Sequence, residues 1–189
     1  MFSSALLSST LTGDVPEGFV VRPLNIGDYD KGFLSLLSQL TRVGDVTREN
    51  FVTRFRTMAD TRPTSYYVVV IEETSTHQLV GSATLVLEWK FIHAAGARAR
   101  IEDVVIRHDM RGRKLGALLN RVLVSLAKLF GVYKISLECK DSLIPFYELN
   151  GFKKDEGNNF LVQRFDKDIT ISPTNDTLET APEVEQSKI

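Results

Sequence analysis

Residues 111–116 read Arg-Gly-Arg-Lys-Leu-Gly, a basic turn with two glycines. A strand-like run, residues 100–107, precedes the turn, and a segment with helical apolar spacing follows it. The first N–H groups of a helix have no partner inside the helix, and they lie at the positive end of its dipole. The turn therefore predicts a site for a phosphate or pyrophosphate group. Taken alone, it is more typical of a plain helix start with solvated cations.

Strands and helices alternate around this turn in a way that predicts a mixed sheet. Strands are expected at residues 19–24, 66–71, 78–89 and 100–107, the last three as a meander. Apolar residues at helical spacing predict one helix over residues 29–40 and a second that starts at Thr47. Strands in a meander, followed by strand–helix–strand units, indicate an α/β (α+β) fold with helices on both faces of the sheet.

The segment after the turn carries the strongest periodicity. Residues 115–130 have a continuous apolar face, and Gly131 is placed to end that helix. Residues 133–140 alternate as a strand does, with Lys134, Ser136 and Glu138 on one side. A short helix is expected from Ser142 to Asn150, and a closing strand over residues 160–165. Residues 166–189 lack aromatic side chains and are mostly acidic and polar, which predicts a disordered tail.

Size and composition are those of one globular domain. The chain has 189 residues and a formal net charge of −1, which argues against a nucleic-acid surface. Cys139 is the single cysteine, so no internal disulfide is possible, and a reducing compartment such as the cytoplasm is expected. No apolar run approaches a membrane span, residues 1–12 make a poor targeting signal, and any membrane association would be peripheral. The ending Ser187-Lys188-Ile189 is only faintly similar to a peroxisomal signal.

The order of these features resembles the GNAT acetyltransferase superfamily. That fold is a mostly antiparallel, twisted sheet that splays at the cofactor site. Within the superfamily the chain resembles the glucosamine-6-phosphate N-acetyltransferases. The closer resemblance rests on residues 40–44 (Leu-Thr-Arg-Val-Gly), 90–93 (Lys-Phe-Ile-His), 101–105 (Ile-Glu-Asp-Val-Val), 133–139 and 163–164. It spans residues 16–165, which leaves 1–15 as an N-terminal extension and 166–189 as the acidic tail.

The resemblance implies acetyl-CoA as cosubstrate, bound largely by main chain and without a metal. Strand residues would serve the pantetheine arm, and the turn would hold the pyrophosphate. The implied set is Val104, Val105, Ile106, Arg111, Gly112, Arg113, Lys114, Leu115, Gly116, Ala117 and Ser142. The superfamily usually has a small residue at position 114, so we expect Lys114 to approach through its backbone. It also tends to have Asn where Ser142 and Leu143 stand, so Ser142 substitutes or a contact is lost.

The implied acceptor is D-glucosamine 6-phosphate, in a pocket at the interface of a homodimer. Phosphate calls for cations and hydrogen-bond donors. By resemblance these are Lys90, His93 and Arg164, with Thr41 nearby. The remaining implied contacts are Phe91, Ile92, Glu102, Asp103, Val104 and Glu138. If the strand is regular, Asp103 should lie on the face opposite Glu102.

The implied chemistry is direct attack of a neutral amine on a thioester within a ternary complex. A proton must leave the amine, and the departing thiolate needs a proton or a donor. Glu102 and Glu138 lie on the polar sides of their strands, and we expect them to orient the amine and take its proton, directly or through water. Tyr147 would be the general acid; its alternative is an aromatic residue packed in the core.

Two other functions stay open. The same fold can acetylate another amine, such as a polyamine or a protein N-terminus, although a basic acceptor would favour carboxylates over Lys90, His93 and Arg164. The chain can also be a CoA-binding module without catalysis, which the presence of Glu138 and Tyr147 disfavours. The leading hypothesis is the sugar-phosphate acetyltransferase, whose product feeds UDP-N-acetylglucosamine synthesis.

Overall fold

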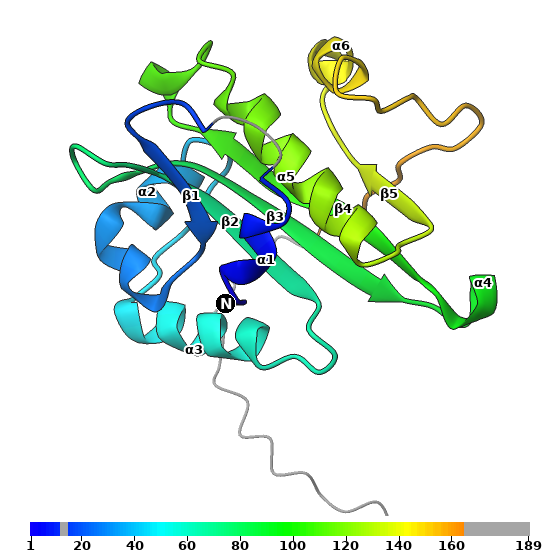
Figure 1. Cartoon of the computed structure of the whole chain (residues 1–189), viewed down its shortest axis with the longest axis horizontal. Coiled ribbons are helices and arrows are strands. Elements are labelled where there is room, and N and C mark those ends of the chain that lie inside the picture. The colour runs from blue at the N-terminus through cyan, green and yellow to red at the C-terminus, as the bar shows by residue number, and fades with distance from the viewer. Residues whose placement is uncertain (12–14, 165–189) are drawn as a thin grey trace, which may run out of the picture. The chain divides into compact units, whose positions relative to one another are not determined.

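A computed structural model describes residues 1–11 and 15–164 of the chain. It divides into two units, Met1–Glu156 and Gly157–Ile189. In the first unit five strands form one sheet in the order β1-β2-β3-β4-β5 (Figure 1). This confirms the predicted α/β architecture. The described part of the N-terminal extension carries α1 (Ala5–Ser8), and Leu7 from α1 is buried in the core.

The sheet is antiparallel except at its last strand. Neighbouring strands β1 (Phe19–Pro23), β2 (Tyr66–Glu73), β3 (Leu79–Trp89) and β4 (Ala97–Ile106) pair antiparallel, and β5 (Lys134–Leu137) pairs parallel to β4. Only Arg98–Ile101 of β4 pairs with β5. The rest of β4 continues without β5 beside it, so the sheet splays there, as the resemblance implies.

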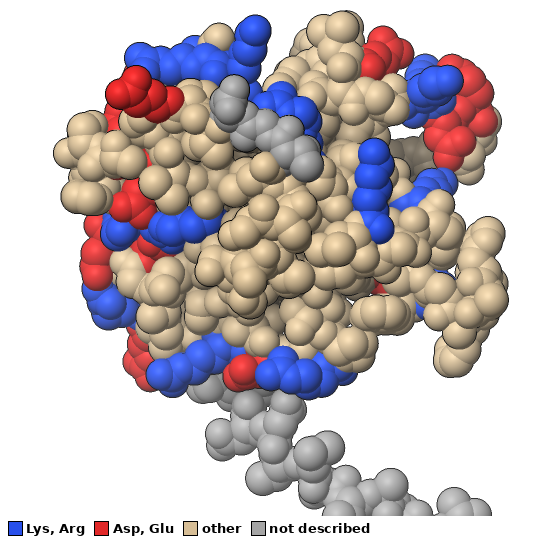
Figure 2. All heavy atoms as spheres, viewed as in Figure 1, with Lys and Arg blue, Asp and Glu red and all other residues tan. Residues whose placement is uncertain are grey.

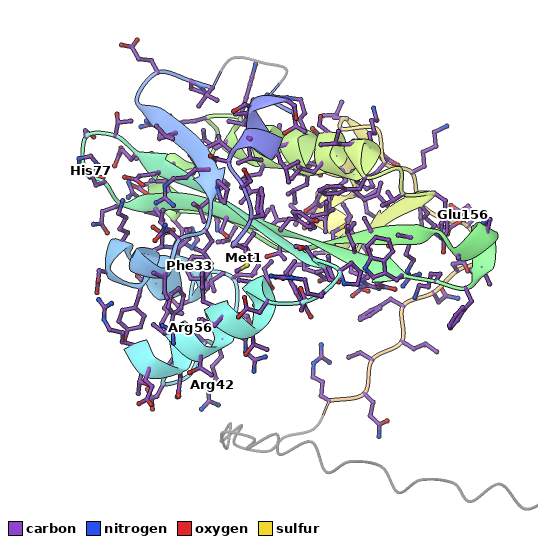
Figure 3. The ribbon with its side chains drawn as sticks, turned by 60° about the horizontal axis from the view of Figure 1, so that its bottom comes forward. Met1, Phe33, Arg42, Arg56, His77 and Glu156 are labelled. Carbon is purple, nitrogen blue, oxygen red and sulfur yellow. The ribbon has the colours of Figure 1, made fainter. Side chains whose placement is uncertain are left out.

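Helices cover both faces of the sheet, as expected. α5 (Leu115–Leu129) lies with α1 over one face, and α2 (Phe33–Leu37) and α3 (Arg48–Ala59) lie over the other (Figure 3). The predicted apolar face of α5 is buried against β2, β3 and β4, with Leu119, Leu123 and Leu126 fully enclosed. Thr47 caps α3 as predicted, because its hydroxyl accepts a hydrogen bond from the N–H of Asn50.

Short elements connect these parts. They are η1 (Ile26–Lys31), α4 (Ile92–Ala95), η2 (His108–Met110), η3 (Asp141–Leu143) and α6 (Ile144–Glu148). The prediction of one continuous helix over residues 29–40 is wrong, because two separate elements occupy this stretch. Gly32 adopts a left-handed conformation, with φ of 78°, and separates η1 from α2.

The closing strand predicted over residues 160–165 is absent from the part of it that the structure describes. Residues 160–164 are in neither helix nor strand, and Phe160, Leu161 and Val162 are exposed. A strand needs backbone hydrogen bonds to a neighbouring strand, and residues 160–164 belong to none of the five paired strands. Residue 165 and the tail 166–189, including Ser187-Lys188-Ile189, lie outside the described residues.

Candidate functional site

The turn before α5 offers a set of free backbone donors. No described residue accepts a hydrogen bond from the N–H groups of residues 112–117. Lys114 is the N-cap of α5 and has a left-handed φ of 60°, a conformation that favours glycine and that Gly112 shares at 79°. Lys and Arg side chains gather over this turn, which includes Arg111, Arg113 and Lys114 (Figure 2). Free donors, exposed cations and the helix dipole together suit a pyrophosphate.

The splayed end of β4 borders this turn. A Cβ atom on Gly116 would lie 3.5 Å from Phe146 Cζ and 3.7 Å from Ile106 Cγ1, so α5, α6 and the end of β4 meet there. Because β4 is unpaired beyond Ile101 on its β5 side, residues Val104–Ile106 lie at the open edge of the sheet. The structure therefore brings the implied pantetheine and pyrophosphate residues together. Ser142, in η3, is exposed and precedes α6 directly.

Asp103 interrupts β4 with a bulge. Its φ is 52°, and the register between β3 and β4 shifts at this point. The strand is therefore not regular at Asp103. The regular alternation on which we based the expected position of Asp103, on the strand face opposite Glu102, does not hold here. Crowding by surrounding protein raises the pKa of Asp103 above its ordinary value, and the adjacent Glu102 carboxylate adds to the rise. After the bulge Val104 packs with the α5 core and Val105 with the α2–α3 core.

Glu102 and Glu138 meet at the point where the two strands part. The last rung of the parallel pair joins Ile101 to Leu137, so each glutamate is the first residue beyond it. Both carboxylates accept hydrogen bonds from Arg100: Nε donates to Glu102 Oε1 at 2.9 Å, and Nη2 donates to Glu138 Oε1. The structure thus places the two predicted carboxylates on one guanidinium.

Tyr147 lies in α6 with a buried ring and a free hydroxyl. The residue is 7% exposed and packs edge-on against Phe146 and Phe152, while no described residue hydrogen-bonds to its hydroxyl. Burial raises the pKa of Tyr147, and nearby Cys139 adds to the rise. The ring of Tyr147 is thus packed in the core, while its hydroxyl has no hydrogen-bond partner among the described residues, and its role as general acid stays a prediction.

The implied acceptor residues around residue 90 lie at the far end of β4. Lys90 Nζ pairs with Glu88 Oε2 at 2.7 Å, and Glu88 also accepts from Arg98 Nε at 2.8 Å. Phe91 and Ile92 are exposed, and the ring of His93 stacks on Tyr133 with 4.0 Å between ring centroids. Hydrogen bonds from Arg98, opposed by burial and aided by Lys90, lower the pKa of Glu88 to about 2.

Thr41 lies toward the opposite end of the same strand. Gln39 Oε1 accepts a hydrogen bond from the N–H of His108, which follows β4, at 2.9 Å. β4 has ten residues, so its two ends are roughly 30 Å apart at about 3.3 Å per residue. One chain therefore does not bring Thr41 together with Lys90 and His93. Arg164 belongs to the second unit, where it is exposed and in neither helix nor strand.

Three residues that share this charged face were not identified from the sequence. They are Arg98, Arg100 and Glu88: both arginines pair with Glu88 across β3 and β4, and Arg100 also pairs with Glu102 and Glu138. Alternation of Arg98, Arg100 and Glu102 along one strand was the available signal. Within the described ranges no group of three or more His, Cys, Asp or Glu residues is placed to hold a metal ion. No helix there is long and apolar enough to cross a membrane.

Comparisons with known proteins agree with this geometry. The acetyltransferase (GNAT) family matches residues 34–152. A probable glucosamine 6-phosphate N-acetyltransferase of Drosophila melanogaster is 48% identical over 152 residues, covering 80% of this chain and 68% of that protein. Glucosamine 6-phosphate N-acetyltransferase 1 of Dictyostelium discoideum is 34% identical, covering 74% and 88%.

A solved structure agrees as well. The crystal structure of glucosamine-6-phosphate N-acetyltransferase from Arabidopsis thaliana superposes with a TM-score of 0.74 at 32% identity, over 80% of this chain and 100% of that one. Free donors at the start of α5, a sheet that opens beside them and the match to residues 34–152 lead to one conclusion. The chain belongs to the GNAT family of acetyltransferases.

Proposed function

We propose that this protein transfers the acetyl group of acetyl-CoA to the amine of D-glucosamine 6-phosphate and releases N-acetyl-D-glucosamine 6-phosphate and CoA. The observation that carries the proposal is the fork between β4 and β5, where Glu102 and Glu138 share Arg100 beside the free donors of α5. Relatives named for this activity, 48% and 34% identical, support the choice of substrate. The product has the chemistry required for UDP-N-acetylglucosamine synthesis.

The main chain supplies the acetyl-CoA site. N–H groups of residues 112–117 hold the pyrophosphate, and the open edge at Val104–Ile106 receives the pantetheine arm. Lys114 contributes its backbone N–H, because it adopts the left-handed conformation that a small residue such as glycine usually adopts at this position. Ser142 serves the cofactor in place of the usual asparagine.

The transfer is direct. Glu102 and Glu138 orient the amine and receive its proton, directly or through water, and the neutral nitrogen then attacks the thioester carbon. The carbon–sulfur bond of the tetrahedral intermediate breaks as Tyr147 protonates the departing sulfur. Burial of Tyr147 keeps its hydroxyl protonated in the neutral range, which suits a proton donor.

We propose that a second copy of the chain completes the acceptor site. Thr41 lies near one end of β4 and Lys90 and His93 near the other, and the strand between them is about 30 Å long, too long for one sugar phosphate to contact all three in a single chain. The exposed apolar residues 160–162 and the fully exposed Phe91 are also typical of surfaces covered by a partner. In a homodimer Arg164 of one chain joins the phosphate-binding residues of the other.

A thiol-release assay tests the function. Purified protein with acetyl-CoA is supplied with D-glucosamine 6-phosphate, with glucosamine, with a polyamine and with a peptide carrying a free N-terminus. Release of CoA with the sugar phosphate at a kcat/KM at least about 100-fold above the others supports the proposal. Preference for another amine identifies a different acceptor, and release with none of them, with CoA binding intact, points to a binding module. The single cysteine suits a reducing, cytoplasmic location.

A further inference from the structure

Arg100 occupies a special place at the fork of the sheet. It pairs in register with Ser136 of β5, one rung before the last one, and its side chain lies on the same face of β4 as Glu102. Ala99 and Ile101, its neighbours in sequence, are buried on the opposite face under α5. The guanidinium therefore reaches across the end of the β4–β5 ladder, to one glutamate on each strand.

These contacts use the Nε and Nη2 donors on one edge of the guanidinium group. Nε donates to Glu102 at 2.9 Å, Nη2 donates to Glu138, and Nε lies 3.9 Å from Glu88 Oε1. The side chain of Arg100 is 28% exposed, so the pairs are partly screened from solvent. A surface ion pair of this kind contributes little to stability. Its geometry, however, fixes how far apart the two carboxylates stand.

We propose that Arg100 is a positioning residue for acetyl transfer, which holds Glu102 and Glu138 apart at the fork and supplies the positive charge that disfavours the ammonium form of the bound amine. The inference rests on the proposed function, in which these carboxylates receive the amine. Two carboxylates alone would stabilise the ammonium ion, which cannot attack a thioester. A cation held between them offsets part of that stabilisation and favours the neutral amine.

The charged groups around Arg100 decide how large this effect is. On β4, Arg100 pairs with Glu102, and Arg98 and Asp103 belong to the same strand. Glu88 lies on β3 and Lys90 directly follows that strand, while Glu138 directly follows β5. Lys134 of β5 instead pairs with Asp155 at 3.1 Å. Glu88 is already neutralised by Arg98 and Lys90, so Arg100 is the cation left for Glu102 and Glu138 among the residues that the structure describes.

Arg100→Met tests the role. Without the cation, the acid limb of the kcat–pH profile should move to higher pH by about one unit, because the bound amine keeps its proton more tightly. At pH 7 kcat should fall at least about tenfold, while KM for the sugar phosphate stays the same or decreases, since the ammonium form binds better. Arg100→Lys restores the positive charge but not the two donor nitrogens that contact the two glutamates. The acid limb should therefore return toward wild type while kcat stays low.

Arg98→Met is the matched control, because Arg98 lies two residues away on the same face and, among the described residues, forms an ion pair with Glu88 and with no other carboxylate. It should leave the acid limb in place. A loss of kcat in Arg100→Met without movement of the acid limb, or an increase in KM alone, overturns the proposal. Arg100→Gln is judged by the same criteria if Arg100→Met does not fold. Wild-type protein that does not acetylate the sugar phosphate contradicts the proposed function itself, before any variant is compared.

Discussion

The ring of Phe146 in α6 lies over Gly116 in the first turn of α5, where a Cβ atom would be 3.5 Å from Phe146 Cζ. That distance is an ordinary van der Waals contact, so one methyl group fits and a branched side chain does not. Gly116 therefore sets how closely α6, with Tyr147, approaches the start of α5. This packing therefore connects the proposed pyrophosphate site to Tyr147, the proposed general acid.

Substitutions at Gly116 should separate packing from ligand binding. We expect Gly116→Ala to increase the free energy of unfolding by up to about 1 kcal/mol, because alanine favours the helix, and to leave kinetics unchanged. Gly116→Val should displace Phe146 and lower kcat at least about tenfold. Urea unfolding and steady-state kinetics measure both. A tenfold rise in the acetyl-CoA KM for Gly116→Ala would instead show that the cofactor itself needs this space.

Tyr147→Phe should affect the reaction and not the fold. The ring is buried while its hydroxyl has no hydrogen-bond partner in the described part of the chain, so removing the oxygen breaks no contact seen there. We expect kcat to fall at least about 100-fold, as for loss of a general acid, with Tm within about 2 °C of wild type. Turnover within a factor of two of wild type would remove Tyr147 from the mechanism.

Asn120 in α5 is a buried polar residue that should lower the stability of the fold. It is 2% exposed, and neither its side-chain oxygen nor its nitrogen has a hydrogen-bond partner among the described residues. An unsatisfied buried amide costs about 1–3 kcal/mol. Asn120→Leu, whose side chain has the same branched shape, should therefore raise the free energy of unfolding by about 1–2 kcal/mol in urea, with catalysis unchanged. Leu123→Asn, the converse change on the same helix, should destabilise; a destabilised Asn120→Leu would mean that the amide has a partner in solution.

Much of the fold is predictable from the sequence, and the reasons are local. α5 and the meander follow from apolar periodicity and turn residues, and both formed as expected. The fork, by contrast, depends on cross-strand register. Arg100 reaches Glu138 because Arg100 pairs with Ser136, and no local pattern contains that register. The bulge at Asp103 was not predicted, and the strand predicted at described residues 160–164 was wrong, for the same reason: each depends on pairing with a neighbouring strand.

Glu72 should control stability in acid. Burial alone would raise its pKa, but hydrogen bonds from Arg22, Lys31 and His77 outweigh burial and lower the pKa to about 2, from 4.5 in the unfolded chain. The carboxylate therefore stabilises the fold fully above about pH 4.5, and this contribution is lost as the pH falls from 4.5 toward 2. It amounts to about 3 kcal/mol.

Glu72→Gln should lose that stability at pH 7 and show a flatter dependence between pH 5 and 3. Denaturant unfolding at each pH measures the difference. The exposed Glu17→Gln is the control and should leave the curve unchanged. Equal pH dependence in Glu72→Gln and wild type would mean that the ion pairs of Glu72 do not set acid stability.

Mixing two impaired variants should reveal whether the acceptor site is shared between chains. If Arg164 of one chain serves the site that contains Tyr147 of the other, a heterodimer of Tyr147→Phe and Arg164→Ala chains has one intact site. Arg164→Ala alone should raise KM for the sugar phosphate at least about tenfold and change that for acetyl-CoA little, because a lost charged contact to phosphate costs about 1.5–3 kcal/mol. After the two variants are unfolded together and refolded, activity at low sugar phosphate above that of either variant alone supports a shared site. Mass photometry checks that heterodimers have formed. If they form and activity does not recover, each chain builds its site alone, and Arg164 contacts the phosphate bound to its own subunit.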